Sequence, residues 1–187
     1  MLKFIQAAAL VSLVSVAMSA QQSSGSAKVK PAPSPSKAVL DSWNDIGRKL
    51  IAMAEDFSED KYDYKPNPTQ RSFAEQLLHA AGSNYYFTNI ATGQKPPTED
   101  YPHRDQYKTK ADIVGFVKKS FDDGAAVIKK MGDGGMSKIV TDTSSNQQVR
   151  VSDLAYGLIE HSGEHYGQLV VYYRTAGLVP PESRPKK

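Results

Sequence analysis

No cysteine occurs among the 187 residues of this sequence. Disulfides, thiol nucleophiles and thiolate metal ligands are therefore excluded, and any metal ion must be bound by imidazole, carboxylate or water. A lipoprotein anchor, which requires a cysteine at the cleavage site, is excluded as well. Histidine is also scarce, with four in the chain, so the search for imidazole ligands is short.

Long hydrophobic runs are missing beyond the first residues. Residues 1–20 have the pattern of a secretory signal peptide, in which Lys3 is the positive region, residues 4–16 are apolar and small residues follow. The apolar run is shorter than the roughly 20 residues that span a bilayer. We therefore expect export to the periplasm or the extracellular space, cleavage after Ser19 or Ala20, and no stable membrane anchor afterwards.

Positive charge is concentrated at the two ends of the chain. Residues 21–37 are rich in serine and proline and are expected to form a disordered linker, and residues 184–187 are a basic tail. Removing the seven basic residues and one acidic residue outside residues 38–181 leaves 16 basic and 19 acidic residues, so the body is mildly acidic although the whole chain carries +3. No helix pattern carries a basic stripe, and we expect no nucleic-acid partner.

Four segments of the domain expected over residues 38–183 repeat apolar residues at helical spacings of three and four. We expect helices over residues 38–57, 72–92, 109–131 and 149–177. No convincing alternating pattern of a strand is present. The sequence therefore predicts an all-α fold, an antiparallel four-helix bundle with long connections.

Local signals mark the ends of these helices. Ser72 with Glu75, and more weakly Thr109 with Asp112, form capping-box patterns at the starts of the second and third helices. Ser152 is the expected N-cap of the last helix. Glycines at positions 93, 132 and 177 are expected to stop the second, third and last helices, and the Asp-Asp-Gly run at 122–124 allows a kink in the third.

Two histidines lie on the apolar face of the last helix. His161 and His165 are one turn apart, with β-carbons separated by about 5–6 Å, so both imidazoles can reach one metal ion. His79 on the second helix is the better candidate for a third ligand than His103, because a helix fixes a side chain more firmly than a proline-rich loop does. The alternative is that these histidines are only hydrogen-bonded in the core.

The sequence around these histidines resembles a known family. Residues 62–87 (YDYKPNPTQRSFAEQLLHAAGSNYYF) and 161–183 (HSGEHYGQLVVYYRTAGLVPPES) are similar to the DinB-like, or DinB/YfiT-like, superfamily of four-helix bundles, and the likeness extends over residues 39–183. The resemblance implies a metal site with one histidine on the second helix and two on the fourth. Residue by residue, these are His79, His161 and His165.

The resemblance implies no single reaction. Relatives include thiol-dependent transferases or isomerases of the cytosol and metal-dependent hydrolases, and an export signal sets this chain apart from the former. We expect an exported metal-dependent hydrolase or transferase that acts on a small molecule and holds zinc or nickel, with iron or manganese as alternatives. Three protein ligands leave a coordination position open. No catalytic residue is assigned, because Glu160 and Glu164 point away from the histidine face.

A second reading is non-enzymatic. In this alternative the ion staples two helices together, and the bundle acts as a binding or stress-related protein. A closed structural site usually has four protein ligands, whereas the sequence offers three good ones. Under either reading the chain could act alone or as a homodimer.

Overall fold

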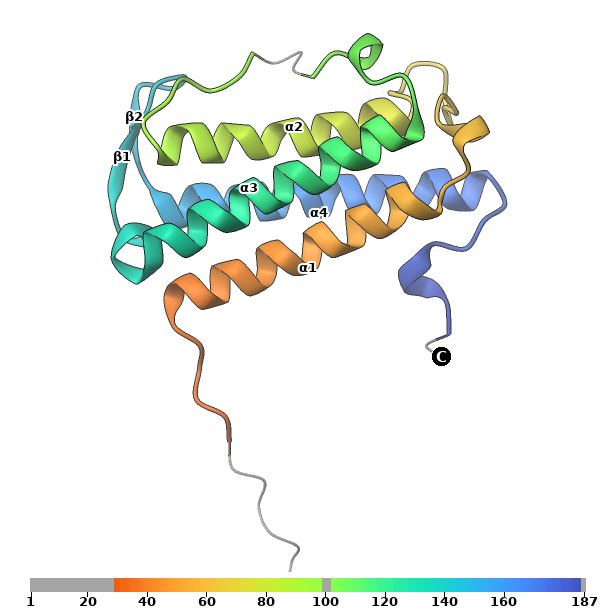
Figure 1. The fold of residues 1–187 in the computed structure, drawn as a ribbon. Helices are drawn as coiled ribbons and strands as arrows, with labels where there is room; N and C mark the ends of the chain where they lie inside the picture. The colour runs from red at the N-terminus through yellow and green to blue at the C-terminus, as the bar shows by residue number, and fades with distance from the viewer. Residues whose placement is uncertain (1–28, 99–101, 186–187) are drawn as a thin grey trace, which may run out of the picture. The chain divides into compact units, whose positions relative to one another are not determined.

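The computed structural model describes residues 29–98 and 102–185 (Figure 1). Residues 33–187 form one compact unit. The expected signal peptide and its cleavage site lie outside the described residues, as do residues 21–28 of the expected linker, and residues 35–37, which were expected to belong to that linker, are helical. Within the described part of the chain, no helix is long and apolar enough to cross a membrane.

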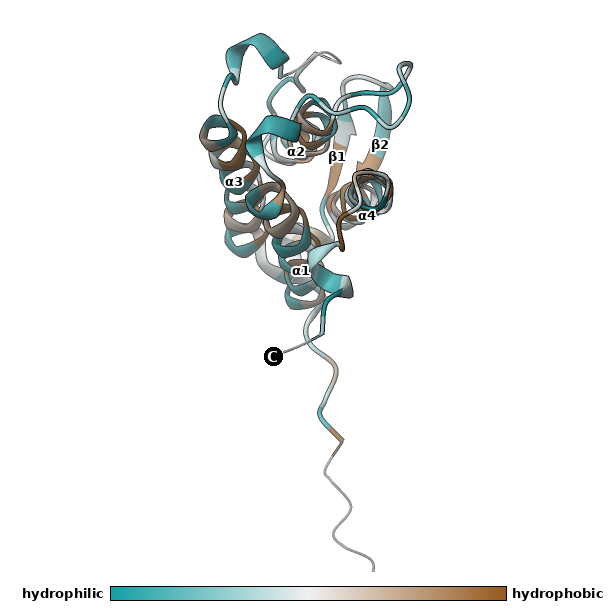
Figure 2. Cartoon of the chain, turned by 90° about the vertical axis from the view of Figure 1, so that its right-hand side faces the viewer, coloured by the Kyte–Doolittle hydropathy of each residue, from teal (hydrophilic) through white to brown (hydrophobic). Residues whose placement is uncertain are grey.

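Four long helices make up the unit. They are α1 (Pro35–Asp56), α2 (Phe73–Ala91), α3 (Lys110–Met136) and α4 (Val151–Thr175). In the view along the bundle α1 lies opposite α2 and α3 lies opposite α4, so α1 and α2 each pack against both α3 and α4 (Figure 2). The connection from α2 to α3 returns along the domain, and α2 and α3 therefore run in the same direction (Figure 1). The predicted all-α four-helix bundle with long connections is confirmed.

The expected capping boxes start α2 and α3. In α2, the Ser72 hydroxyl accepts from the Glu75 backbone N–H at 3.2 Å and the Glu75 carboxylate accepts from the Ser72 N–H at 2.6 Å. Thr109 and Asp112 make the same reciprocal pair in α3. These bonds satisfy backbone donors that the first helical turn leaves without partners.

The third helix departs from expectation at two glycines. Residues 122–124 are regular helix, and Gly124 instead makes room for Trp43, because a β-carbon there would lie 2.1 Å from the indole. The break in α3 is at Gly132, which has a positive φ of 58° and lies within the span rather than beyond its end. Glycine adopts this backbone conformation without the steric cost that a β-carbon adds.

A β-hairpin follows α3, where the sequence suggested only a polar connection. Strands β1 (Ile139–Asp142) and β2 (Gln147–Arg150) pair antiparallel. The Val151 N–H extends the pairing by donating to Lys138 O at 3.0 Å, and α4 begins at Val151 with Arg150 as its N-cap. The expectation of Ser152 as N-cap is wrong, because strand pairing brings the chain to the helix start two residues earlier.

Candidate metal centre

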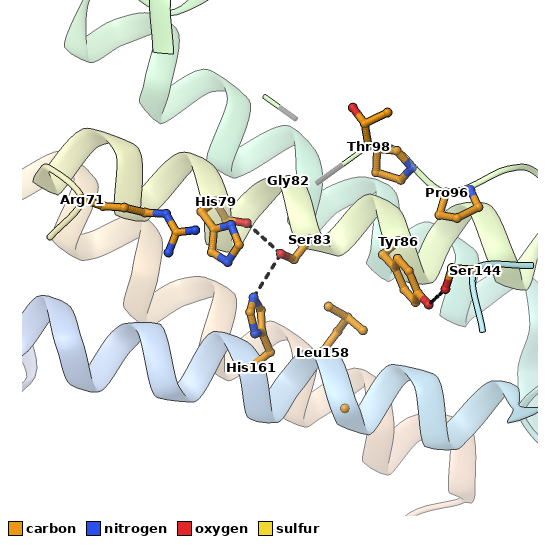
Figure 3. Close-up of a pocket in the computed structure, with 12 residues that line it drawn as sticks. Arg71, His79, Gly82, Ser83, Tyr86, Pro96, Thr98, Ser144, Leu158 and His161 are labelled. Atoms are coloured by element: carbon orange, nitrogen blue, oxygen red, sulfur yellow. Dashed lines mark hydrogen bonds between the residues drawn. The ribbon is translucent and has the colours of Figure 1, made fainter. Parts of the chain in front are cut away.

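Helices α2 and α4 bring three histidines together. His79 lies in the second turn of α2, whose start is fixed by its capping box, and it faces His161 and His165 on α4 (Figure 3 shows His79 and His161). One potential ligand nitrogen from each ring lies within 4.8 Å of the others. The sequence-predicted triad is therefore assembled by the packing of α2 against α4.

The spacing of the nitrogens suits a single ion. The Nε2 atoms of His161 and His165 are 3.1 Å apart, and the ring of His79 lies 5.3 Å and 4.8 Å, centroid to centroid, from those of His161 and His165. A tetrahedral ion with metal–nitrogen bonds of about 2.0–2.1 Å would separate its ligands by about 3.3 Å. The residues present thus fit an ion held by imidazoles.

Burial keeps these imidazoles in the form that binds metals. It lowers the pKa of His79 and of His165 to about 4, and positive charge on neighbouring groups, including Arg71, acts in the same direction. Burial also lowers the pKa of His161, although the carboxylate of Glu164 opposes this in part. All three rings are therefore neutral at pH 7, and a neutral imidazole has a lone pair free for coordination.

Two polar side chains of α2 contact the ligand histidines. The Ser83 hydroxyl donates to His79 O at 2.8 Å and lies 3.0 Å from His161 Nε2. The amide of Gln76 contacts His165 Nδ1 and also the amide of Gln168. Gln76 is 2% exposed, so its side chain is fixed between the two helices.

Sequence reasoning missed Gln76. The available signal was its position three residues before His79, which places both side chains on one side of α2. A metal-binding histidine usually donates its second ring N–H to an oxygen, which fixes the ring. A rotated amide can present its oxygen, so Gln76 can serve His165 in this way.

A cavity of about 650 Å³ opens beside the histidines (Figure 3). Arg71 lies at one end, and Tyr86 and Ser144 lie at the other, with Leu158 between them. The remaining described wall residues are His79, Gly82, Ser83, Pro96, Pro97, Thr98, Gly157 and His161. This volume is within the range of small-molecule sites.

The hairpin closes the far end of the cavity. The Tyr86 hydroxyl donates to Asp142 Oδ2 at 2.7 Å and contacts Ser144, and both partners belong to the β1–β2 turn region. Burial alone would raise the pKa of Asp142, but hydrogen bonds from Tyr86, Ser145 and Ser144 outweigh it and hold the pKa well below its usual range. Asp142 is therefore a carboxylate that fixes Tyr86.

The other sequence candidates lie away from the cluster. His103 is exposed at the start of a short 3₁₀ turn (Arg104–Gln106) and does not join the three histidines. Glu160 and Glu164 are exposed, as expected from their positions on α4. Among the described residues, no aspartate or glutamate belongs to the group that could hold the ion.

A four-helix bundle whose second and fourth helices bring three neutral histidines to one point is a helical protein with a candidate imidazole metal site. Comparison with known proteins gives the family. A sequence profile of the DinB superfamily matches residues 44–169, and the chain belongs to this superfamily. YjoA of Bacillus subtilis (strain 168), an uncharacterized protein, is 28% identical over 127 residues, which are 67% of this chain and 80% of YjoA.

Solved structures show the same fold. The DinB-like protein YjoA of Bacillus subtilis matches with a TM-score of 0.62 and 20% identity, over 80% of this chain and 99% of YjoA. A DinB-like protein of Bacillus cereus ATCC 10987 matches with a TM-score of 0.66 and 18% identity, over 78% and 95% of the two chains. YfiT of Bacillus subtilis is described as a probable metal-dependent hydrolase with an unusual four-helix bundle topology. It matches with a TM-score of 0.62 and 13% identity, over 82% of this chain and 95% of YfiT.

Proposed function

We propose that this protein is an exported metal-dependent enzyme whose divalent ion is held by His79, His161 and His165. The convergence of three ligand nitrogens within 4.8 Å, beside a cavity of about 650 Å³, is the observation that supports it. Zinc or nickel suits three imidazoles best, and iron or manganese are the alternatives. The reaction is hydrolysis or group transfer on a small molecule.

The ion, when bound, acidifies a water molecule or polarises a substrate oxygen. The chain's own residues supply the rest of the site. His79 and His161 line the cavity, so the open side of the cluster faces the space where a substrate can bind. Gln76 fixes His165 from behind, and Pro96 and Pro97 form part of the cavity wall.

No carboxylate of the described residues lies in the cluster to act as a general base. A hydrolytic water would therefore rely on the ion for its acidity, which favours substrates with good leaving groups. The description of YfiT as a probable metal-dependent hydrolase is a reason to test hydrolysis of activated esters first.

The metal site is tested by measuring bound ion in single variants. His79→Ala, His161→Ala and His165→Ala should each lose most of the ion, while helicity stays near that of the wild type because the apolar core does not involve these rings. His103→Ala is the matched control and should keep full stoichiometry. Mass spectrometry of untagged protein gives the metal content, and circular dichroism gives the helicity. Full occupancy in all three ligand variants would refute the site.

The same measurements separate the enzyme from the metal-stapled binding protein. Removal of the ion by a chelator should leave the bundle folded if the site is catalytic, whereas a structural ion would take much of the helicity with it. Export is tested independently by cell fractionation with N-terminal sequencing. Recovery of intact Met1 in the cytoplasm of the native host would contradict export and leave the metal site standing.

A further inference from the structure

Arg71 is fixed at the edge of the candidate metal centre. It directly precedes the N-cap of α2, and its backbone carbonyl accepts a hydrogen bond from the Tyr172 hydroxyl at 2.5 Å. The guanidinium extends from the start of α2 towards His79 (Figure 3). It lines both the main cavity and a second cavity of about 440 Å³, bounded by Gln76 and Gln168, on the other side.

The charge of Arg71 has no partner among the described residues. Arg48 binds Glu182 at 2.6 Å and Arg184 binds Asp56 at 2.6 Å, whereas Arg174, which also has no ion pair among the described residues, does not line the cavity. Glu75, the acidic residue closest in sequence to Arg71, is already used by the capping box of α2 and lies 3.5 Å from Lys65. The guanidinium of Arg71 therefore keeps its donors available on the cavity wall.

With an ion bound, the described wall of the cavity would have an excess of positive charge. Three neutral imidazoles do not neutralise a divalent ion, and no aspartate or glutamate is among the described residues that line the cavity. Arg71 adds a further charge, which contributes, after burial, to the lowered pKa values of all three histidines. A half-enclosed positive site of this kind attracts anions and favours their binding.

We propose that the cavity binds a substrate with a carboxylate group, which Arg71 holds while another polar group of the same molecule faces the three histidines. This inference rests on the proposed function and names its substrate class. A planar guanidinium pairs with a carboxylate through two parallel hydrogen bonds. Arg71 is the single cationic side chain among the described wall residues, which suits a monoanion better than a phosphate dianion.

The remainder of the cavity wall indicates the size and polarity of the rest of that substrate. Beyond the histidines the wall is formed by Gly82, Leu158 and the Pro96–Pro97 pair, so this part accepts a compact apolar group. The Tyr86 hydroxyl lies at the far end, held by Asp142. The substrate is therefore anionic at the Arg71 end and apolar towards Tyr86.

Calorimetric titration of the zinc-loaded protein tests this assignment. The probes are benzoate and benzamide, which are similar in shape and differ in charge. The wild type should bind benzoate more tightly than benzamide. Arg71→Gln should weaken benzoate binding about tenfold or more, as expected for loss of a charge-assisted hydrogen-bond pair, and leave benzamide binding unchanged. Arg71→Lys keeps the charge but loses the planar pair of donors, so its affinity for benzoate should be intermediate.

Two controls complete the experiment. Lys65→Gln removes a nearby exposed cation outside both cavities and should bind benzoate as the wild type does. Zinc content, measured by mass spectrometry, should be unchanged in all variants. Wild-type affinity for benzoate in fully loaded Arg71→Gln, or no preference for benzoate in the wild type, would overturn the inference and leave the metal site intact. Failure of the wild type to take up any ion would instead overturn the proposed function and this inference with it.

Discussion

The seam between α1 and α3 and the seam between α2 and α4 are built from opposite kinds of side chain. In the α1/α3 seam, Trp43 is fully buried against Phe121 and Gly124, and its indole N–H donates to Phe121 O at 2.9 Å. A β-carbon at Gly47 would come within 2.7 Å of Phe121, so these helices pack as closely as glycine permits. In the part of the α2/α4 seam beside the cavity the facing side chains are the three histidines, Ser83, Gln76 and Gln168, whereas Phe73 packs against Tyr172 and Tyr173 at one end of the seam.

This difference separates stability from chemistry within one bundle. Close packing of aromatic rings removes a large apolar area from water and contributes strongly to folding. Polar side chains lose water when they are buried and regain little unless they are hydrogen-bonded. The α2/α4 seam accepts this cost at the histidines and opens a cavity of about 650 Å³ there, whereas the cavity between α1 and α3 is smaller, at about 360 Å³. This is the pattern expected of a site kept for binding rather than for stability.

The largest effect on stability is expected at Trp43. Trp43→Ala should lower the free energy of unfolding by about 3–5 kcal/mol, since it empties a closely packed aromatic site. The folded fraction should still bind the ion, because the rings packed against Trp43 are those of Phe87 and Phe121 and not those of the three histidines. Denaturant unfolding followed by circular dichroism gives the stability. A loss below about 1 kcal/mol would mean that the two seams share the stabilisation.

Substitution of Gln76 should lower metal affinity more than stability, the reverse of the effect expected at Trp43. Gln76→Leu removes the group that contacts His165 Nδ1, and loss of such a partner typically lowers metal affinity by about 10–100-fold. The stability of the metal-free protein should change by no more than about 1 kcal/mol, because leucine fills a similar volume between the helices. Competition with a zinc-binding dye measures the affinity.

Gln168→Leu is the matched control for this prediction. Gln168 contacts Gln76 and also hydrogen-bonds His165, but its side chain is exposed, so water can replace it. Its effect on zinc affinity should therefore be clearly smaller. Equal losses in the two variants would indicate a shared hydrogen-bond network in place of a specific support for His165.

The sequence was sufficient wherever the determining signals are local. Apolar spacings predicted four helices, and Ser72 with Glu75 predicted the start of α2. The spacing of His161 and His165 on one helix face, together with a histidine in the middle of α2, predicted the cluster that the fold assembles. The helices, the start of α2 and the pair His161 and His165 depend on residues three or four positions apart, which interact whatever the rest of the chain does. The third member, His79, is distant in sequence and was predicted from its place on a helix and from the family resemblance.

Features that depend on distant residues were not predicted. The β1–β2 hairpin has polar residues in place of an alternating pattern, and it is held by pairing and by the bond between Tyr86 and Asp142, 56 residues apart. The placement of Arg71 beside the histidines depends on Tyr172, which is 101 residues away. No local rule of sequence anticipates contacts of this separation.

The stability of the metal-free protein is also expected to depend on pH. The pKa values of His79 and His165 are about 4 in the folded chain, against about 6.5 in an unfolded one. Between these values the unfolded chain binds more protons than the folded chain does. The free energy of unfolding should therefore fall as the pH is lowered from 6.5 towards 4, and it should be insensitive to these groups above pH 6.5.

A variant in which all three histidines are glutamine isolates this contribution, because glutamine does not titrate. With a chelator present, the wild type should lose stability between pH 6.5 and 5, while the variant should be nearly flat. Carboxylates with a lowered pKa, such as Asp56 beside Arg184, begin to act at lower pH and affect both proteins equally. Equal slopes for the two proteins above pH 5 would show that the histidines are well hydrated in the folded state. The α2/α4 seam would then be as open to water as an ordinary surface groove.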